Sequence, residues 1–567
     1  MNKVFSASQR INKWYIFILP ILVLSSLLDF AGTALVFPLI SLLAGEQNSE
    51  NHTIIGFIYE ACDTLGISSE NKWLIIYIAM IFILKAILFI SYRWIVSDKV
   101  LQWMVDTRLQ IYRAIYKSAF SEVSEDRSRL VNAFTTQCDA AHGAIVISFE
   151  LWLGMMVALS GVLLANLISW QVFLILMIFG LLLGIVIKLT MKLSLKYGYQ
   201  LAEHNKKLLS IMGQAVERFR YLKSTFTSER LFTDLIPIVN KVKKIQVRHA
   251  VINATTSSLT EPISIVLIGL LFWLGKLMDI ENSILVMQSI VMYRLLTRIL
   301  PLSSQLQVFS KAYASLEYIE STFDELNSKK ESSRNNKLLS QLETIEFQNV
   351  FFNYGKEKIL ENINFCFQKS QILLVVGKSG SGKTTLLNLL NGLLVPDAGK
   401  IGINGSNLTE INLDDYRSKI GLLSQEPTLF NMSLRNNLTL RNSNIKDEEL
   451  HLWLKKFDLI GLFENGQIDL DREVNELSSN LSGGQKQRLC FIREILSKPE
   501  LLILDEPTSA LDSKSKELIM QNIEEIKHEA LVVIITHDND LYGSADLIFY
   551  TETGVLKNTR KVNGCLS

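Results

Sequence analysis

The sequence has few cysteines and almost no net charge. Each of these features excludes a class of site or partner. Five cysteines are scattered through 567 residues without a Cys-x-x-Cys pair or a metal-ligand spacing, so we interpret them as reduced or buried thiols. The formal net charge is +1, and no stretch of the chain forms a basic domain. A nucleic-acid partner is therefore not expected.

Long apolar runs, in contrast, are abundant. Apolar residues make up 49% of the chain and the mean hydropathy is +0.24. Six runs reach about the 20 residues that cross a hydrocarbon layer of about 30 Å, so the sequence predicts six membrane spans. The runs are Trp14–Gly45, Trp73–Val96 and, approximately, 144–168, 170–192, 251–276 and 282–302. The first run is too long for a signal peptide, and no small-residue cleavage site follows it.

The charges of the connecting segments predict the orientation of these spans. Residues 97–142 and 188–248 carry six and thirteen Lys or Arg, whereas 45–72 carries one and 166–171 carries none. Because positive connections stay in the cytoplasm, both termini are expected there. The two positive connections are also long, mostly polar and helical in periodicity, which predicts helices that continue past the membrane.

A polar segment, Asn327–Lys337, separates two different sequence patterns. After it, short apolar strands such as "ILLVVG" and "LLILD" alternate with helices, which is typical of a soluble α/β domain with a largely parallel sheet. We therefore expect a helical membrane domain over residues 1–325, a linker over 326–342 and an α/β domain over 343–567.

The segment "LLVVGKSGSGKTTLLNLL" places a phosphate-binding loop between a strand and a helix. Its glycines let backbone N–H groups wrap a phosphate, Lys383 reaches the β- and γ-phosphates, and the Thr384 hydroxyl can bind Mg²⁺. The candidate ATP-binding residues of this phosphate loop are Gly377, Lys378, Ser379, Gly380, Ser381, Gly382, Lys383, Thr384 and Thr385.

The segment "LLILDEPTSALD" adds two acids at the end of an apolar strand. Asp505 can hold the Mg²⁺ shell, and Glu506 is suited to orient and deprotonate an attacking water. Two adjacent acids at a strand end can also be solvated charges. The phosphate loop in the same domain favours the catalytic interpretation.

These two motifs, with "LSGGQ" at Leu481–Gln485 between them, resemble the nucleotide-binding domain of ATP-binding cassette (ABC) proteins over about residues 340–560. The six preceding spans with long cytoplasmic helices resemble the exporter branch, as a half-transporter in one chain. The resemblance implies a polytopic helical membrane domain fused to an α/β P-loop domain. It also implies that two such domains pair head to tail around ATP, so that the signature residues of one copy meet the γ-phosphate held by Lys383 of the other. Those signature residues are Ser482, Gly483, Gly484 and Gln485.

The resemblance assigns roles to four isolated residues. Tyr354 would stack on adenine, although an isolated tyrosine is as often a core residue. Gln425 in "LLSQEP" would sense Mg²⁺ and meet the membrane domain, and Asp512 in "SALD" would act across the dimer. His537 in "IITHD" would contact the γ-phosphate. The implied catalytic set is Glu506, His537, Lys383 and Gln425, and the implied Mg²⁺ set is Thr384, Gln425 and Asp505.

One stretch departs from the exporter pattern. Exporters usually carry a glycine-containing segment ahead of the signature, but here Val474–Ser478 reads "VNELS", which keeps Glu476 and has no glycine. This departure concerns the coupling of ATP hydrolysis to transport, and it does not concern the use of ATP itself. Because Glu506, His537 and the signature are intact, a homodimer is expected to have two competent sites.

Several charged residues fall inside the predicted spans, where a central charge costs about 2.5–3.5 kcal/mol and calls for a partner or water. Asp29 and Lys85 both fall near mid-membrane, and we expect them to form a structural ion pair. These charged residues include Asp29, Lys85, Glu150, Glu261, Arg294 and Arg298.

Arg294 and Arg298 are four residues apart and share one face of the sixth span. In the family that span lines the cavity, so these arginines, with Lys85, are candidates for binding a phosphate or carboxylate of the cargo. The alternative is that the arginines pair with Glu150 or Glu261, or that Arg298 anchors the inner edge of the span.

The cargo is the least determined feature. The stretches "LLDFAGTALVFPLI" and "YRLLTRILP" resemble those of bacterial lipid-linked oligosaccharide flippases, which also have a short external helix after the first span; Thr53–Ile67 has a matching apolar stripe. Exporters of antimicrobial peptides and of glycolipids share much of this pattern. No cysteine-protease-like domain precedes the first span, so we do not expect this chain to process its cargo.

The function expected from the resemblance is ATP-driven export or flipping of an amphipathic substrate by alternating access. The partners would be the bilayer and a second copy of the chain, or a homologous half-transporter, with ATP and Mg²⁺ as cofactors. We expect a bacterial plasma membrane with the nucleotide-binding domain in the cytoplasm. A peptide exporter and an ATP-gated membrane regulator that does not pump are the alternatives.

Overall fold

The structure is a computed structural model of the 567-residue chain. It describes residues 9–36, 71–120, 127–225, 227–258, 260–278, 280–331, 337–460, 468–474, 481–509, 511–552 and 555–558. The chain divides into two compact units: unit 1 contains Met1–Lys117 and Asp126–Ser328, and unit 2 contains Ser118–Glu125 and Lys329–Ser567. The division at Ser328 falls inside the predicted linker.

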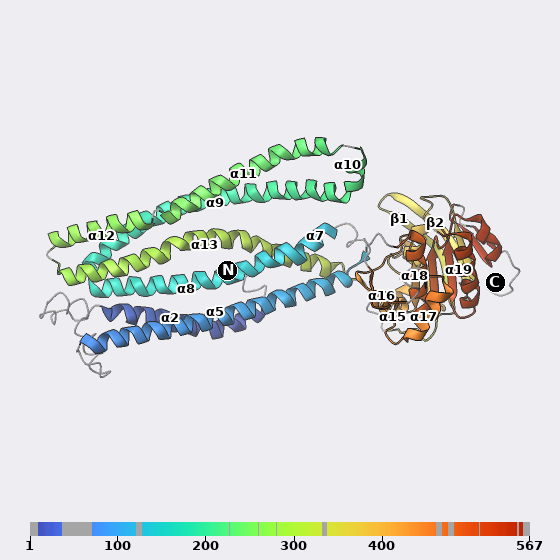
Figure 1. The fold of residues 1–567 in the computed structure, drawn as a ribbon, viewed down its shortest axis with the longest axis horizontal. Coiled ribbons are helices and arrows are strands. Elements are labelled where there is room, and N and C mark those ends of the chain that lie inside the picture. The colour runs from blue at the N-terminus through green and yellow to red at the C-terminus, as the bar shows by residue number, and fades with distance from the viewer. Residues whose placement is uncertain are drawn as a thin grey trace. The chain divides into compact units, whose positions relative to one another are not determined.

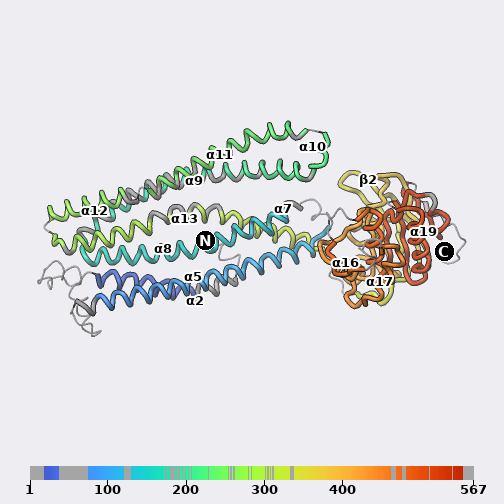
Figure 2. The backbone as a smooth tube through the Cα atoms, viewed as in Figure 1, coloured from blue at the N-terminus to red at the C-terminus, as the bar shows by residue number. Residues whose placement is uncertain are grey.

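Unit 1 is built from long helices (Figure 1). Helix α8 packs along α13, α2 packs against α5 and α8, and α9 runs beside α11 (Figure 2). The helices are α2 (Gln9–Ala34), α5 (Asn71–Tyr116), α7 (Arg127–Asn132), α8 (Cys138–Ile168), α9 (Trp170–Glu217), α10 (Phe219–Thr225), α11 (Ser228–Ser258), α12 (Thr260–Leu277) and α13 (Asn282–Ser328). A π-helical turn, Ala133–Gln137, joins α7 to α8.

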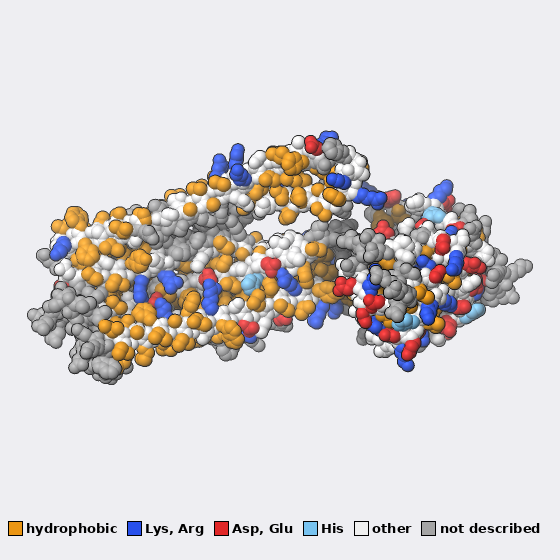
Figure 3. Space-filling model, in the orientation of Figure 1, with side chains coloured by type: hydrophobic (Ala, Val, Ile, Leu, Met, Phe, Trp, Pro, Cys, Tyr) orange, Lys and Arg blue, Asp and Glu red, His pale blue; other side chains and the backbone are white. Residues whose placement is uncertain are grey.

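These helices are apolar on their outward faces and not only in the core between them. On α5, Ile83, Ile90 and Trp94 are 60%, 66% and 72% exposed, and hydrophobic side chains cover much of the visible helical surface in Figure 3. Water disfavours an apolar surface of this extent, and hydrocarbon favours it.

Two stretches within the described residues, Ile75–Tyr116 and Arg129–Ile168, are long and apolar enough to cross a membrane. Ile18–Ala34 and Pro262–Leu277 form shorter apolar helices, so the number of six spans stays a prediction. The expected long extensions are present: α5 has 46 residues and α9 has 48. At about 1.5 Å per residue each helix is more than twice as long as a hydrocarbon core of about 30 Å.

Unit 2 contains the predicted α/β domain, with a six-stranded sheet in the order β12-β11-β3-β10-β9-β6. Strands β11, β3, β10, β9 and β6 are parallel, and β12 is antiparallel to β11. The strands are β3 (Ile372–Val376), β6 (Ile420–Leu423), β9 (Leu501–Asp505), β10 (Leu531–Ile535), β11 (Leu547–Tyr550) and β12 (Val555–Asn558). The apolar runs seen in the sequence are buried on both faces, as a central parallel sheet requires.

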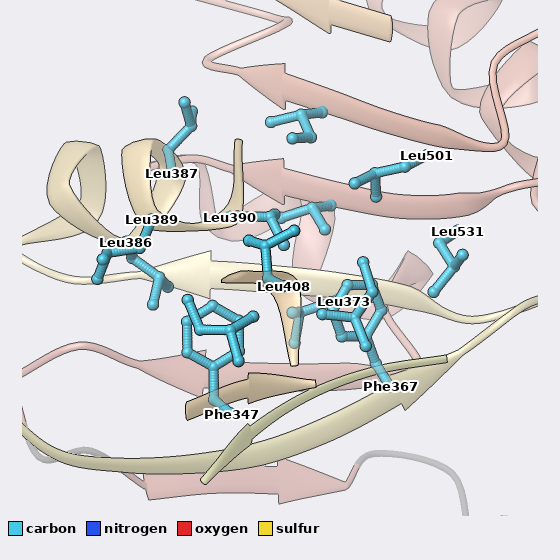
Figure 4. Close-up of a cluster of buried hydrophobic side chains, with 14 of the residues drawn as sticks. Phe347, Phe367, Leu373, Leu386, Leu387, Leu389, Leu390, Leu408, Leu501 and Leu531 are labelled. Atoms are coloured by element: carbon cyan, nitrogen blue, oxygen red, sulfur yellow. The ribbon is translucent and has the colours of Figure 1, made fainter. Parts of the chain in front are cut away.

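An antiparallel sheet in the order β2-β1-β4-β5 lies over one face of this sheet. Between them, phenylalanines of the antiparallel sheet such as Phe347 and Phe367 pack with leucines of α14 and the parallel strands (Figure 4). The strands are β1 (Thr344–Tyr354), β2 (Glu357–Gln368), β4 (Ala398–Ile403) and β5 (Ser406–Asn407).

Helices cover the other face of the parallel sheet, where a second buried cluster joins residues of α17, α18 and α19 to the strands. The helices of unit 2 are α14 (Lys383–Leu390), α15 (Leu413–Ser418), α16 (Leu434–Leu438), α17 (Asp447–Lys456), α18 (Gly483–Leu496) and α19 (Ser513–Ile526). A two-stranded antiparallel pair, β7 (Met432–Ser433) and β8 (Glu473–Val474), contributes Val474 to the same buried cluster. The rest of the "VNELS" stretch and the predicted external helix Thr53–Ile67 lie outside the described residues.

Candidate functional site

The phosphate loop connects the end of β3 to the start of α14 at Lys383. Gly380 and Gly382 have φ values of +83° and +91°, a left-handed backbone that favours glycine. A Cβ at Gly382 would also lie 2.8 Å from the Leu360 side chain. Lys383 Nζ donates to the carbonyl oxygens of Gly377 and Lys378 at 2.7 and 2.8 Å, so its ammonium group lies over the loop where phosphates would bind.

Two acids meet the loop at the carboxyl ends of the parallel strands. Asp505 ends β9, opposite Ile535 at the end of β10, and Glu506 follows it. Burial raises the pKa of Asp505, an effect that Glu506 increases and that Lys383 and His537 oppose. Partial burial lowers the pKa of Lys383, while Glu506 and Asp505 act in the opposite direction. The ammonium group and both carboxylates therefore form one interacting cluster.

The carboxylate of Glu506 lies between two further predicted residues. Gln425, two residues beyond β6, donates from Nε2 to Glu506 Oε2 at 3.4 Å. His537 Nε2 lies 3.6 Å from Glu506 Oε1. The structure thus brings together Lys383, Asp505, Glu506, Gln425 and His537 within one chain.

The signature residues stand at the start of α18. Ser482 is its N-cap: its Oγ accepts from the Gln485 backbone at 3.2 Å, and Gln485 Oε1 accepts from the Ser482 backbone at 2.8 Å. Ser482 and Gly483 are exposed, and Gly484 lies in the first turn. The positive end of a 14-residue helix suits an anion. Among the described residues, no hydrogen bond or ion pair joins the signature to the phosphate loop.

Within the described part of the chain, no hydrogen bond or ion pair joins Tyr354 or Asp512 to this cluster. Tyr354 is 50% exposed at the end of β1 and packs edge-on against Phe352, with the ring centres 5.0 Å apart. It is therefore not a core residue, and its ring can take a stacking partner. Asp512 is the N-cap of α19, accepting from the Ser515 backbone at 3.2 Å. The hydrogen bonds with Ser515 hold the pKa of Asp512 below its ordinary value.

Gln487 is a residue of this site that the sequence interpretation missed. It is 1% exposed in α18 and donates from Nε2 to the backbone carbonyl of Glu506 at 2.9 Å. The only signal in the sequence was a polar residue on the apolar face of the helix, five positions after Ser482.

Unit 1 contains a separate charged site that links three helices. Lys85 of α5 and Arg294 of α13 both contact Asp29 Oδ1 of α2, Arg294 at 3.3 Å, and Arg294 also donates to Thr33 Oγ1. The expected ion pair of Asp29 with Lys85 is confirmed. Within the described residues the carboxylate partner of Arg294 is Asp29, and Glu150 pairs with Arg93 instead. The Glu261 side chain lies outside the described residues, so its pairing with Arg294 stays a prediction.

These residues line a cavity of about 260 Å³, which a second cavity of about 190 Å³ adjoins. Lys85 and Arg298 line both cavities. In the second, Arg93 forms an ion pair with Glu150 at 2.6 Å, and Gln305 donates to Glu150 at 3.3 Å. Arg298 forms no ion pair within the described part of the chain. The sequence interpretation did not single out Arg93, although it follows Lys85 by eight residues and so falls near the same helix face.

Two family models match the chain: "ABC transporter transmembrane region" over residues 15–300 and "ABC transporter" over residues 360–509. The human "ATP-binding cassette sub-family B member 5" is 36% identical over 219 residues, 38% of this chain and 17% of that protein. The "ATP-dependent lipid A-core flippase" of Desulfotalea psychrophila is 34% identical over 212 residues, 37% of each chain. The "Leukotoxin translocation ATP-binding protein" of a Pasteurella haemolytica-like species is 33% identical over 246 residues, 43% of this chain and 35% of that protein. The chain thus spans less than half the length of each of these relatives.

Proposed function

Because this chain belongs to the ABC transporter family, we propose that it is an exporter or flippase that moves an amphipathic substrate across a membrane by alternating access, driven by ATP hydrolysis. The observation that carries the proposal is the cluster of Lys383, Asp505 and Glu506 at one sheet edge, in a chain whose other unit holds a cationic cavity.

In the proposed reaction the phosphate loop and Lys383 bind the phosphates of ATP. Thr384, Gln425 and Asp505 fit Mg²⁺, because hydroxyl, amide and carboxylate oxygens are ligands that it accepts beside phosphates. The ion would neutralise charge that develops on the transferred phosphate. Glu506 takes a proton from the attacking water, whose oxygen bonds to the γ-phosphorus as the bond to the bridging oxygen breaks. His537, beside Glu506, contacts the γ-phosphate.

A second copy of the chain would complete each site. Ser482 and Gly483 are exposed at a helix start, and within the described residues no hydrogen bond or ion pair joins them to the phosphate loop of their own chain. A head-to-tail homodimer would bring them to the ATP held by the other copy. A homologous half-transporter could take the place of one copy.

For the substrate we propose an amphiphile with an anionic headgroup. The two adjoining cavities are lined by four cations, Lys85, Arg93, Arg294 and Arg298, and by two carboxylates, Asp29 and Glu150, which leaves an excess of two positive charges. A phosphate or carboxylate would balance that excess, and arginine can bind either through two parallel hydrogen bonds. A lipid-linked oligosaccharide, or another lipid with a phosphate headgroup, fits this chemistry.

A peptide or protein cargo is the second candidate. Two relatives are named for toxin translocation, the leukotoxin protein above and the "Toxin RTX-III translocation ATP-binding protein" of Actinobacillus pleuropneumoniae. The excess positive charge of the cavities favours an anionic lipid over a basic peptide.

The family and the apolar helices support a membrane protein with a cytoplasmic ATPase domain. A bacterial plasma membrane, with both termini in the cytoplasm, is proposed from the charges of the connecting segments.

The test is the ATPase rate of the full chain in nanodiscs with a lipid-linked glycan, phosphatidylglycerol or a basic peptide added. We expect the anionic lipids to stimulate the rate, and Arg298→Gln to reduce that stimulation. Lys276→Gln, which removes an exposed cation outside both cavities, should leave it unchanged. Stimulation by the peptide alone would favour the second candidate, and no stimulation by any probe would contradict the proposed substrate class.

A further inference from the structure

The backbone of Glu506 has an unusual conformation. Its φ is +50°, in the left-handed region that residues with a Cβ rarely adopt. In this conformation the carboxylate lies beside Gln425 and His537. It persists only if neighbouring groups hold it, because an unsupported residue relaxes to negative φ.

Several hydrogen bonds hold this backbone. The Glu506 N–H donates to the Ile535 carbonyl at 2.8 Å. Its own carbonyl accepts from Gln487 Nε2 at 2.9 Å, from Ser509 Oγ at 3.1 Å and from the Ser509 N–H at 3.3 Å. The shortest of the three bonds to the carbonyl comes from Gln487, which belongs to a different helix.

The amide oxygen of Gln487 argues against a purely structural role for this residue. Gln487 Oε1 is buried and has no hydrogen-bond partner among the described residues. A buried polar atom without a partner destabilises the fold. An apolar side chain of similar volume would fill the same space without that penalty.

We propose that Gln487 is a positioning residue that holds Glu506 in its catalytic conformation and couples it to the signature helix α18. The N-terminus of α18 carries Ser482, and its second turn carries Gln487. The inference rests on the ATP hydrolysis proposed above. In the proposed dimer, α18 of one copy closes over the ATP that is held by the other copy. A shift of α18 on closing moves its Gln487 amide, and this amide holds Glu506 in the site of its own copy. Each site thereby senses whether its neighbour holds ATP.

The test compares Gln487→Met with Asn522→Leu in the full chain. Asn522 is a matched control: it is also 1% exposed, its Oδ1 also lacks a partner among the described residues, and its Nδ2 donates to Leu518 within α19. We expect Gln487→Met to lower kcat at least tenfold, to change KM less than threefold, to leave the Tm equal or higher, and to lower the Hill coefficient for ATP. Asn522→Leu should leave kcat and the Hill coefficient unchanged.

A kcat for Gln487→Met within twofold of the wild-type value would overturn the proposal, as would an equal loss in both variants. If Gln487→Met and Gln487→Leu both fail to fold, the amide is needed for stability and the proposal is also wrong. A wild-type chain without ATPase activity would contradict the proposed function itself, so the two failures are distinguishable.

Discussion

The imidazole of His537 lies beside the carboxylate of Glu506, with Nε2 3.6 Å from Oε1. The two residues follow neighbouring parallel strands, β10 and β9, whose carboxyl ends lie at one edge of the sheet. This edge is where α/β proteins place their chemistry. The relationship makes Glu506 the centre of the candidate hydrolytic site, with Gln425 on its other oxygen.

Glu506→Gln should bind ATP and nearly stop hydrolysing it. The amide keeps the shape of the side chain but cannot accept the proton of the attacking water. A hundredfold fall in rate corresponds to about 2.7 kcal/mol of barrier. Phosphate release and retention of labelled ATP measure the two effects. Glu529→Gln, at an exposed carboxylate of the same unit, is the control and should behave as wild type. Normal turnover by Glu506→Gln would remove Glu506 from the mechanism.

Asp29 and Lys85 should couple in a double-mutant cycle on thermal stability in detergent. Asp29→Asn leaves both Lys85 and Arg294 without their shared carboxylate, whereas Lys85→Gln leaves Asp29 with Arg294. The Asp29 variant should therefore be the less stable of the two. The double variant should be more stable than the sum of the single effects implies, with a coupling energy of about 0.5–3 kcal/mol. Additive effects would mean that the two residues are not partners.

Asp505→Asn should raise the Tm at neutral pH while impairing Mg²⁺-dependent hydrolysis. Burial raises the pKa of Asp505 in the folded chain above its unfolded value of about 3.9. Ionisation therefore destabilises the folded state at pH above the folded pKa, and protonation relieves this as the pH falls. The Tm advantage of the variant should be greatest near pH 7–8 and should shrink toward pH 4, as thermal melts across this range will show. An advantage that grew on acidification would have the wrong sign.

A disulfide between the phosphate loop and the signature should form only between two copies of the chain. Cysteines at Ser379 and Gly483, in a chain whose five native cysteines are replaced, report the head-to-tail pairing when ATP is bound. Ser379 is preferable to Gly380, whose φ of +83° disfavours a side chain. Gel mobility separates crosslinked dimers from monomers. A link found only within single chains would exclude the proposed pairing.

The heterodimer of Ser482→Arg with Lys383→Ala offers a functional readout of the same pairing. One interface then carries both defects and the other carries none, so ATPase activity should return if one sound site can turn over alone. Each homodimer should remain inactive.

Short-range patterns predicted the loop and the strand end that carry the candidate nucleotide site. The glycines before Lys383 predict a loop, and the acids after "LLIL" predict the end of a strand. Both predictions need only residues that are neighbours along the chain. The parallel sheet followed from apolar runs that need burial on both faces. The sequence could not assign Arg294 to Asp29 or Arg93 to Glu150, since those pairs join different helices and depend on how the helices pack. Gln487 was missed for the same reason: its partner is a backbone carbonyl nineteen positions away.

The most direct test of ATP-driven lipid transport is movement of an anionic lipid in proteoliposomes that contain the full chain. A fluorescent phosphatidylglycerol and a membrane-impermeant quencher report the fraction of label in the outer leaflet before and after ATP is added. We predict an ATP-dependent shift with the wild-type chain, no shift with Glu506→Gln, and no shift of a fluorescent lipid that has an uncharged headgroup. If the wild-type chain hydrolyses ATP but does not move the labelled phosphatidylglycerol, the proposed transport of an anionic lipid is wrong.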